Sequence, residues 1–157
     1  MIMNNIDQTI KFISVNIGLI TISDSRNEEN DTSGKLLKEK ITEYGHKVLR
    51  QTIISDDIEN IKQTLINFSN DPKIDAIITT GGTGLTGRDS TPEAIMDLAS
   101  KVIDGFGELF RQISYEKIKT SSIQSRAIGA IINHTYVFSL PGSTGACKDG
   151  WNEILKY

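Results

Sequence analysis

Strand-like apolar runs alternate with amphipathic stretches of helical period along most of this sequence. The run FISVNIGLITIS (residues 12–23) is rich in β-branched residues and long enough for a buried strand. The next stretch, TSGKLLKEKITEYG, places apolar residues at helical spacing and ends in a glycine, a common helix stop. The same two patterns then predict a strand over 46–54, a helix over 57–70 and a strand over 74–80. Such alternation favours a largely parallel sheet with helices on both faces.

The second half of the chain continues this alternation and adds a hairpin. Helices are predicted from Pro92 onward and over residues 106–118. RAIGAIINHTYVFSL is interpreted as two short strands around a turn at residues 133–135. ACKDGWNEILK is predicted to close the chain as a helix, packed on the sheet through Trp151, Ile154 and Leu155. The predicted fold class is therefore α/β, with a mostly parallel sheet and a short β-hairpin.

Composition limits the class of protein. A chain of 157 residues with 38% hydrophobic and 24% charged residues is typical of one globular domain. A net charge of −3 argues against a general nucleic-acid binder. Because no stretch reaches membrane-spanning length and the N-terminus lacks a signal-peptide pattern, we expect a cytoplasmic protein with no membrane partner. Residues 1–11 are expected to form an N-terminal tail or an arm onto a neighbouring subunit, and residues 12–157 a single domain.

The segment AIITTGGTGLTGRDSTPEAI (residues 76–95) concentrates glycines between a strand and a helix. Glycines before a helix N-terminus leave main-chain N–H groups free, and the helix dipole adds partial positive charge, so the loop predicts an anion site, most often for phosphate. A tight turn without a ligand is the alternative. Pro92 suits the first helical turn, Ser90 or Thr91 is a candidate cap, and Ser90 with Glu93 has the spacing of a capping box.

Two known phosphate loops provide tests of this segment. The pattern G-x-x-x-x-G-K-[ST] is absent, whereas GTGLTG (82–87) matches G-x-G-x-x-G and Asp104 lies near the position of a ribose-binding acid. That dinucleotide motif normally opens the first strand–helix unit, with its third glycine already inside the helix. Here the loop follows the third strand and RDSTP delays the helix, so we do not interpret the match as a dinucleotide site.

Other polar segments also follow predicted strands. Ligands of parallel α/β sheets bind beyond the carboxyl ends of the strands. SDSR (23–26), SDD (55–57), the glycine loop and LPGSTG (140–145) all lie at such ends, and they would form one pocket if the strand order brings them together.

The most specific hypothesis about this edge of the sheet concerns Asp56 and Asp89. A carboxylate at the mouth of an anion loop would repel phosphate, but Mg²⁺ resolves the conflict because it binds one or two carboxylates together with substrate phosphate oxygens. Nucleotidyl transfer would use both aspartates, through positioning and charge neutralisation. The structural alternative is that Asp89 caps the helix after the loop and Asp56 caps the helix that begins near Asp57.

Several segments together resemble one known family. TTGGTGLTGRDSTPEA, ISDSR, DTSG (31–34), GFGELFRQIS (105–114), SSIQSR (121–126) and LPGSTGACKDGW resemble the MoaB/MogA family of molybdenum cofactor biosynthesis proteins, and the MoaB branch in particular. The resemblance runs from about residue 13 to residue 155. It implies a three-layer α/β/α domain of the MogA-like molybdopterin-binding fold, assembled as a homotrimer or as a dimer of trimers (a homohexamer). Other cofactor-biosynthesis proteins are possible partners.

The resemblance also implies a reaction. In active members the molybdopterin phosphate attacks the α-phosphorus of Mg-ATP, giving adenylylated molybdopterin and pyrophosphate. Catalysis and Mg²⁺ binding map to Asp56 and Asp89. Substrate binding by ATP and molybdopterin maps to Ser23, Asp24, Thr80, Gly81, Gly82, Thr83, Gly84, Ser90, Thr91, Glu93, Pro141, Gly142 and Ser143. The alternative function is a non-catalytic oligomeric molybdopterin-binding or scaffold protein of the MoaB branch.

Two further alternatives are weaker. CinA-like proteins share a glycine loop, but their second acidic position is replaced here by GRD. Cys147, the single cysteine, excludes an internal disulfide and thiolate zinc clusters, and it suggests Cys147–His134 nucleophilic catalysis only if the fold joins the two. In GFGELF, the large side chains could serve the core or a subunit contact; the adjacent glycines favour the contact (Phe106, Leu109 and Phe110).

Overall fold

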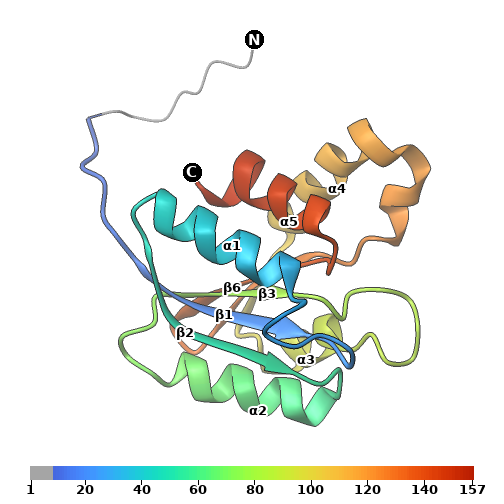
Figure 1. The fold of residues 1–157 in the computed structure, drawn as a ribbon, viewed down its shortest axis with the longest axis horizontal. Coiled ribbons are helices and arrows are strands. Elements are labelled where there is room, and N and C mark those ends of the chain that lie inside the picture. The colour runs from blue at the N-terminus through green and yellow to red at the C-terminus, as the bar shows by residue number, and fades with distance from the viewer. Residues whose placement is uncertain (1–8) are drawn as a thin grey trace.

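The computed structural model describes residues 9–157 and consists of three layers. A six-stranded sheet lies between α1, α4 and α5 on one face and α2 and α3 on the other (Figure 1). The elements in chain order are β1 (Asn16–Ile22), α1 (Thr32–Glu43), β2 (Lys47–Ile54), α2 (Ile58–Ser69), β3 (Ala76–Thr80), α3 (Thr91–Leu98), β4 (Lys101–Ile103), α4 (Asp104–Ile118), the 3-10 helix η1 (Lys119–Gln124), β5 (Ile128–Ile132), β6 (Thr135–Leu140), α5 (Thr144–Gly150) and the π-helical turn η2 (Trp151–Leu155). The predicted α/β class is confirmed.

The sheet has the order β2-β1-β3-β6-β5-β4. The pairs β1–β2, β1–β3 and β3–β6 are parallel, whereas β6–β5 and β5–β4 are antiparallel. The predicted hairpin is β5–β6, and Asn133 in its turn has a φ of 53°, a left-handed conformation that asparagine tolerates. Because four neighbouring strands are parallel, their carboxyl ends and the loops that follow them share one edge of the sheet.

Alternate residues of the central strands supply two separate cores. Ile20 and Ile22 of β1 face α2 and α3, whereas Ile17 and Leu19 face α1, α4 and α5. This alternation is the two-residue period of a strand, and burial on both faces explains why β1 is a continuous apolar run. Trp151 is buried in the second core, as predicted, with Ile154 and Leu155 half-buried against it.

The boundaries differ from the sequence prediction at the N-terminal end. The strand predicted over residues 12–23 begins at Asn16, because the preceding backbone bonds elsewhere: Val15 N–H donates to His46 Nδ1. The predicted N-terminal arm over residues 1–11 lies, for residues 1–8, outside the described residues; Ile10 is exposed.

Two short elements, β4 and η1, were not predicted, since their three and six residues carry no hydrophobic period.

The interpretation of GFGELF as a subunit contact is wrong for its two phenylalanines. Phe106 and Phe110 of α4 are buried in the second core, and their rings lie 6.4 Å apart. Leu109, on the other side of the helix, is 42% exposed. Helical spacing therefore divides this segment between core and surface. No helix among residues 9–157 is long and apolar enough to cross a membrane.

Candidate functional site

The loops after β1, β2, β3 and β6 meet at the carboxyl edge of the parallel strands, at the right of Figure 1. This arrangement confirms that the four polar segments predicted at strand ends come together. Their main chains and side chains are directly linked by the hydrogen bonds Ser23 N–Ile54 O (2.9 Å), Asp56 N–Asp24 Oδ1 (3.0 Å), Gly81 N–Leu140 O (3.0 Å) and Ser90 N–Asp56 Oδ1 (3.3 Å).

Gly81 and Gly82 open the glycine loop in conformations that favour glycine, with φ angles of 103° and 67°. A Cβ at Gly81 would stand 2.1 Å from the carbonyl oxygen of Ile22, and one at Gly82 would stand 2.2 Å from Thr91 Oγ1. The loop therefore needs these two glycines to pack against β1 and α3. Within the described part of the chain, the N–H groups of Gly82 and Thr83 donate no hydrogen bond to another protein atom.

Asp89 folds back onto the loop instead of capping α3. Its Oδ2 accepts hydrogen bonds from the N–H of Thr86 (2.9 Å) and from the Thr86 hydroxyl (2.6 Å). The Thr86 hydroxyl is the main cause that lowers the pKa of Asp89, with smaller contributions from the main chain of Thr86 and Gly84 and from Arg126. Asp89 is therefore ionised at neutral pH, and the capping explanation for it is wrong.

Asp56 lies nearly buried between the loop and α3. Its Oδ1 accepts from the N–H (3.3 Å) and hydroxyl (3.2 Å) of Ser90. Burial raises the pKa of Asp56 and repulsion from Asp89 and Asp24 adds to it, while the bonds from Ser90 oppose it. The capping role belongs to Asp57, which accepts from Asn60 N–H at 3.0 Å. The carboxylates of Asp24 and Asp89 thus lie close enough to disfavour ionisation of Asp56, and a bound cation would relieve that repulsion.

The start of α3 differs in detail from the predicted capping box. Pro92 occupies the first turn as expected, but Ser90, the N-cap residue, makes no side-chain cap bond. Its hydroxyl donates to Asp56, and Glu93 forms an ion pair with Arg126. Both side chains are therefore committed to neighbouring segments. The capping-box prediction is wrong because tertiary partners outcompete the local ones.

Thr80 and Thr91 are buried, and their hydroxyls are used inside the protein. Thr80 Oγ1 donates to Pro141 O (3.1 Å), and Thr91 Oγ1 donates to Gly81 O (3.1 Å). Thr83 is likewise buried, with 4% of its surface exposed. These three buried threonines therefore stabilise the loop from the protein interior.

The second small-residue loop, residues 141–143, is fixed through its carbonyl oxygens. Gly142 O accepts from Arg26 Nη2 and from the hydroxyl of Ser33, each at 2.7 Å. Ser143 caps α5 by accepting from Ala146 N–H at 3.2 Å. Pro141 O accepts from the Thr80 hydroxyl at 3.1 Å, so the carbonyl oxygens of this loop are bound by residues of three different segments.

At the mouth of the site, Asp24 is bound by Arg88 through both Nε (3.1 Å) and Nη2 (2.8 Å). This ion pair, together with the N–H of Asp56, lowers the pKa of Asp24. The neighbouring Ser23 hydroxyl accepts from the N–H groups of Ser25 and Arg26 (3.2 Å each) and so stabilises the turn after β1. Asp24 therefore positions the main chain of Asp56 by accepting its N–H, and it neutralises the charge of Arg88.

The donor set fits Mg²⁺ better than a transition metal. No group of three or more His, Cys, Asp and Glu side chains gathers to hold a metal anywhere in residues 9–157. Two oxygen ligands from Asp56 and Asp89, completed by substrate phosphates and water, match the way Mg²⁺ binds in phosphoryl-transfer sites.

Sequence reasoning missed three arginines that organise this edge: Arg26, Arg88 and Arg126. Each contacts a predicted site residue or its main chain. Only the first two lie in segments that were singled out beside a strand end. Arg126 lies before β5, and nothing in its local sequence indicates that it reaches the glycine loop.

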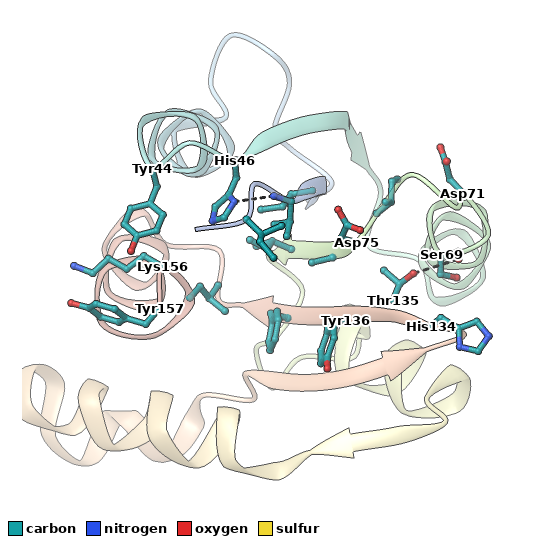
Figure 2. A pocket seen from close by; sticks show the side chains of 18 of the residues that line it. Tyr44, His46, Ser69, Asp71, Asp75, His134, Thr135, Tyr136, Lys156 and Tyr157 are labelled. Carbon is teal, nitrogen blue, oxygen red and sulfur yellow. Dashed lines mark hydrogen bonds between the residues drawn. The ribbon is translucent and has the colours of Figure 1, made fainter. Parts of the chain in front are cut away.

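A large cavity lies at the opposite edge of the sheet, beside the amino ends of the strands. Figure 2 shows Tyr44, His46 and Tyr157 on one side and Asp75 and Tyr136 on the other. Its volume is about 1340 Å³, and none of the predicted site residues lines it. The chemistry predicted from the sequence is therefore placed entirely at the other edge.

The structure rules out Cys147–His134 catalysis. His134 precedes β6, whereas Cys147 lies beyond its carboxyl end, where Sγ contacts Thr80 Oγ1 (3.1 Å) and Pro141 O (3.4 Å). Six strand residues separate these ends, a span of roughly 20 Å at 3.3 Å per residue. Burial raises the pKa of the Cys147 thiol to about 11.

This environment predicts an unreactive thiol. At pH 8 native protein should react with a disulfide reagent such as DTNB at least ~100-fold more slowly than urea-unfolded protein, because the thiolate is the reactive form and burial disfavours it. The reactivity should rise only as the pH approaches 11, whereas folding stability should already fall above the ordinary thiol pKa near 9, where only the unfolded thiol loses its proton, and this loss should be complete near pH 11. Absorbance at 412 nm measures the reaction. Equal rates for native and unfolded protein would show that Cys147 is accessible.

Comparison with known proteins identifies the family. Residues 18–157 match the family described as probable molybdopterin binding domain. The chain belongs to this family. Molybdenum cofactor biosynthesis protein B of Bacillus cereus is 49% identical over 138 residues, which are 87% of this chain and 82% of that protein. The Escherichia coli K12 protein of the same name is 39% identical over 145 residues, covering 92% and 85%.

A crystal structure of molybdenum cofactor biosynthesis protein B superimposes with a TM-score of 0.89 at 46% identity, covering 92% of this chain and 90% of that one. The MoaB branch of the MoaB/MogA family is thereby confirmed, and so is the MogA-like fold. A CinA protein from Thermoplasma acidophilum superimposes with a TM-score of 0.66 at 14% identity, which shows a shared fold alone. This chain is thus a molybdenum cofactor biosynthesis protein of a molybdopterin-binding family.

Proposed function

We propose that this member of the family is a molybdopterin adenylyltransferase, which transfers AMP from Mg-ATP to the phosphate of molybdopterin. One observation carries the proposal: Asp56 and Asp89 flank a loop with free main-chain N–H groups, at the carboxyl edge of a parallel sheet. This combination can hold a polyphosphate and a divalent cation at the same point.

Different groups of residues would bind the nucleotide, the molybdopterin phosphate and Mg²⁺. The N–H groups of Gly82 and Thr83, which donate no hydrogen bond within the described residues, would bind phosphate oxygens of the nucleotide. The loop of residues 141–143, whose Gly142 carbonyl oxygen is held by Arg26 and Ser33, would contact the phosphate of molybdopterin. Asp56 and Asp89 would hold Mg²⁺, which supplies charge neutralisation for the phosphates.

The reaction balances as a single displacement. An oxygen of the molybdopterin phosphate forms a bond to the α-phosphorus of ATP, and the bond from that phosphorus to the β-phosphate oxygen breaks. Pyrophosphate leaves with the electron pair. The protein contributes alignment of the two substrates and stabilisation of the developing charge, which are the main sources of catalysis in phosphoryl and nucleotidyl transfer.

Pyrophosphate release tests the proposal. With molybdopterin, ATP and Mg²⁺ present, the wild-type protein should release one pyrophosphate per adenylylated molybdopterin formed, and EDTA should stop the reaction. Molybdopterin is omitted in the control. If correctly folded protein binds molybdopterin tightly yet releases no pyrophosphate, the enzymatic proposal is wrong and the non-catalytic binding or scaffold function replaces it.

A further inference from the structure

Arg126 connects three points of the glycine loop and its helix. Its Nε donates to Gly84 O at 2.9 Å, its Nη2 donates to Asp89 O at 2.7 Å, and its Nη1 forms an ion pair with Glu93 in the first turn of α3. The side chain comes from the segment between η1 and β5, so it reaches the loop from a different part of the fold. All three acceptors belong to the span 84–93.

Arg126 holds the main chain of residues 84–89 from outside the loop. Among residues 9–157, Arg126 alone of the outside side chains bonds main-chain atoms of residues 84–89; the remaining bonds are internal, from Thr86 and Gly84 to Asp89 and from Asp89 N–H to Thr86. A Cβ at Gly84 would stand 2.7 Å from Asp89 Oδ2, so the Asp89 carboxylate lies directly against the main chain at Gly84. Arg126 therefore binds the loop on both sides of this carboxylate.

We infer that Arg126 is a positioning residue that sets the place of the Asp89 carboxylate. It does so by binding the carbonyl oxygens of Gly84 and Asp89 and the side chain of Glu93, which fixes the main chain on both sides of residues 85–88. The inference adds a residue to the proposed function and rests on it for its role in turnover. Its structural part, the ordering of the loop, is independent of any reaction.

The guanidinium geometry is essential to this role. A planar fork places donors toward three acceptors in different directions, whereas a lysine ammonium on a flexible stem is a single point of charge. Arg126→Lys therefore keeps the charge and removes the three-point contact. Arg50→Lys is the matched control, because Arg50 also donates to a side chain, Asn67 Oδ1 at 3.1 Å, but contacts no residue of the loop.

Hydrogen exchange of the ligand-free protein tests the ordering. The amides of Thr86, Asp89 and Ser90 are hydrogen-bonded in the loop, and they should exchange about 10-fold faster in Arg126→Lys than in wild type, since the local opening free energy falls. Amides of β1 and β3 should be unchanged, and Arg50→Lys should match wild type throughout. Unchanged exchange at residues 86–90 in Arg126→Lys would overturn the inference.

Steady-state kinetics test the consequence for turnover. In Arg126→Lys, kcat for pyrophosphate release should fall about 100-fold, the effect of a misplacement near 1 Å, with KM for Mg-ATP within about 3-fold of wild type. A higher KM with unchanged kcat and unchanged exchange would mean that Arg126 binds the nucleotide directly, and positioning would be wrong. If the wild type releases no pyrophosphate, the proposed function fails, while the exchange experiment still decides the ordering role.

Discussion

Replacing Asp89 with asparagine should lower the rate of pyrophosphate release about 10²–10³-fold, the range for losing one preorganised electrostatic contact. The amide oxygen of asparagine can still accept the hydrogen bonds from Thr86, so the loop should keep its shape. What disappears is the negative charge that would hold Mg²⁺ beside the substrate phosphates. The measurement is kcat/KM for Mg-ATP at fixed molybdopterin.

Asp57→Asn is the matched control for this experiment. It removes a carboxylate from the same edge of the protein, but Asp57 only caps α2, and asparagine is an equally good cap. Its rate should equal that of wild type. If Asp89→Asn also retains the wild-type rate with an intact fold, Asp89 has no part in the reaction.

The same variant should change the pH dependence of stability. Because the pKa of Asp89 is lowered in the folded protein, its carboxylate stabilises the fold above the ordinary aspartate pKa, and this contribution is lost as the pH falls through the lowered value. The difference in unfolding free energy between wild type and Asp89→Asn should therefore shrink between pH 6 and pH 3. Asp56 has the opposite sign, since its raised pKa means that its ionisation costs stability as the pH rises.

Replacing Gly81 with alanine should destabilise the protein by roughly 3–5 kcal/mol, at the upper end of single substitutions. Two independent costs combine: a φ of 103° is unfavourable for alanine, and the new Cβ would lie 2.1 Å from the Ile22 carbonyl oxygen. The neighbouring atom is main chain of β1, so it cannot move aside without disturbing the pairing of Ile22 with Ile54 of β2. Urea unfolding followed by circular dichroism gives the free energy.

Gly87→Ala serves as the control within the same loop. A Cβ at Gly87 would have no atom within 4 Å, so the change in unfolding free energy should stay within about 0.5 kcal/mol, as at ordinary surface positions. Equal effects of the two substitutions would show that the loop is not held against β1. This pair of variants separates glycines that the fold requires from those that it tolerates.

The order of elements was predictable because its signals are local. The apolar runs of β1 and β3 and the helical spacing of α1 and α2 depend on which faces are buried, and each is visible within a dozen residues. The placement of loops at strand ends followed from the parallel sheet. Short elements such as β4 and the exact start of β1 were not predicted, because a few half-exposed residues show no hydrophobic periodicity.

The site was predictable only in part. The glycine loop, Asp56 and Asp89 were identified from sequence, and the fold brings them together with the loops after β1 and β6. The partners of each side chain were not predictable. Ser90 and Glu93 have the spacing of a capping box, yet they bind Asp56 and Arg126, because a charged partner from another segment offers a stronger hydrogen bond than the local main chain.

By itself, the sequence determined the α/β class, the position of the glycine-rich loop after the third strand and the presence of Asp56 and Asp89 at strand ends, since these depend on local pattern and on residue type. Tertiary structure alone decided which carbonyl oxygens Arg126 and Arg26 occupy, that Cys147 is buried far from His134, and that Phe106 and Phe110 belong to the core. The physical reason is that side-chain partners across a sheet are set by strand order, and residues separated by dozens of positions meet only after the sheet has formed.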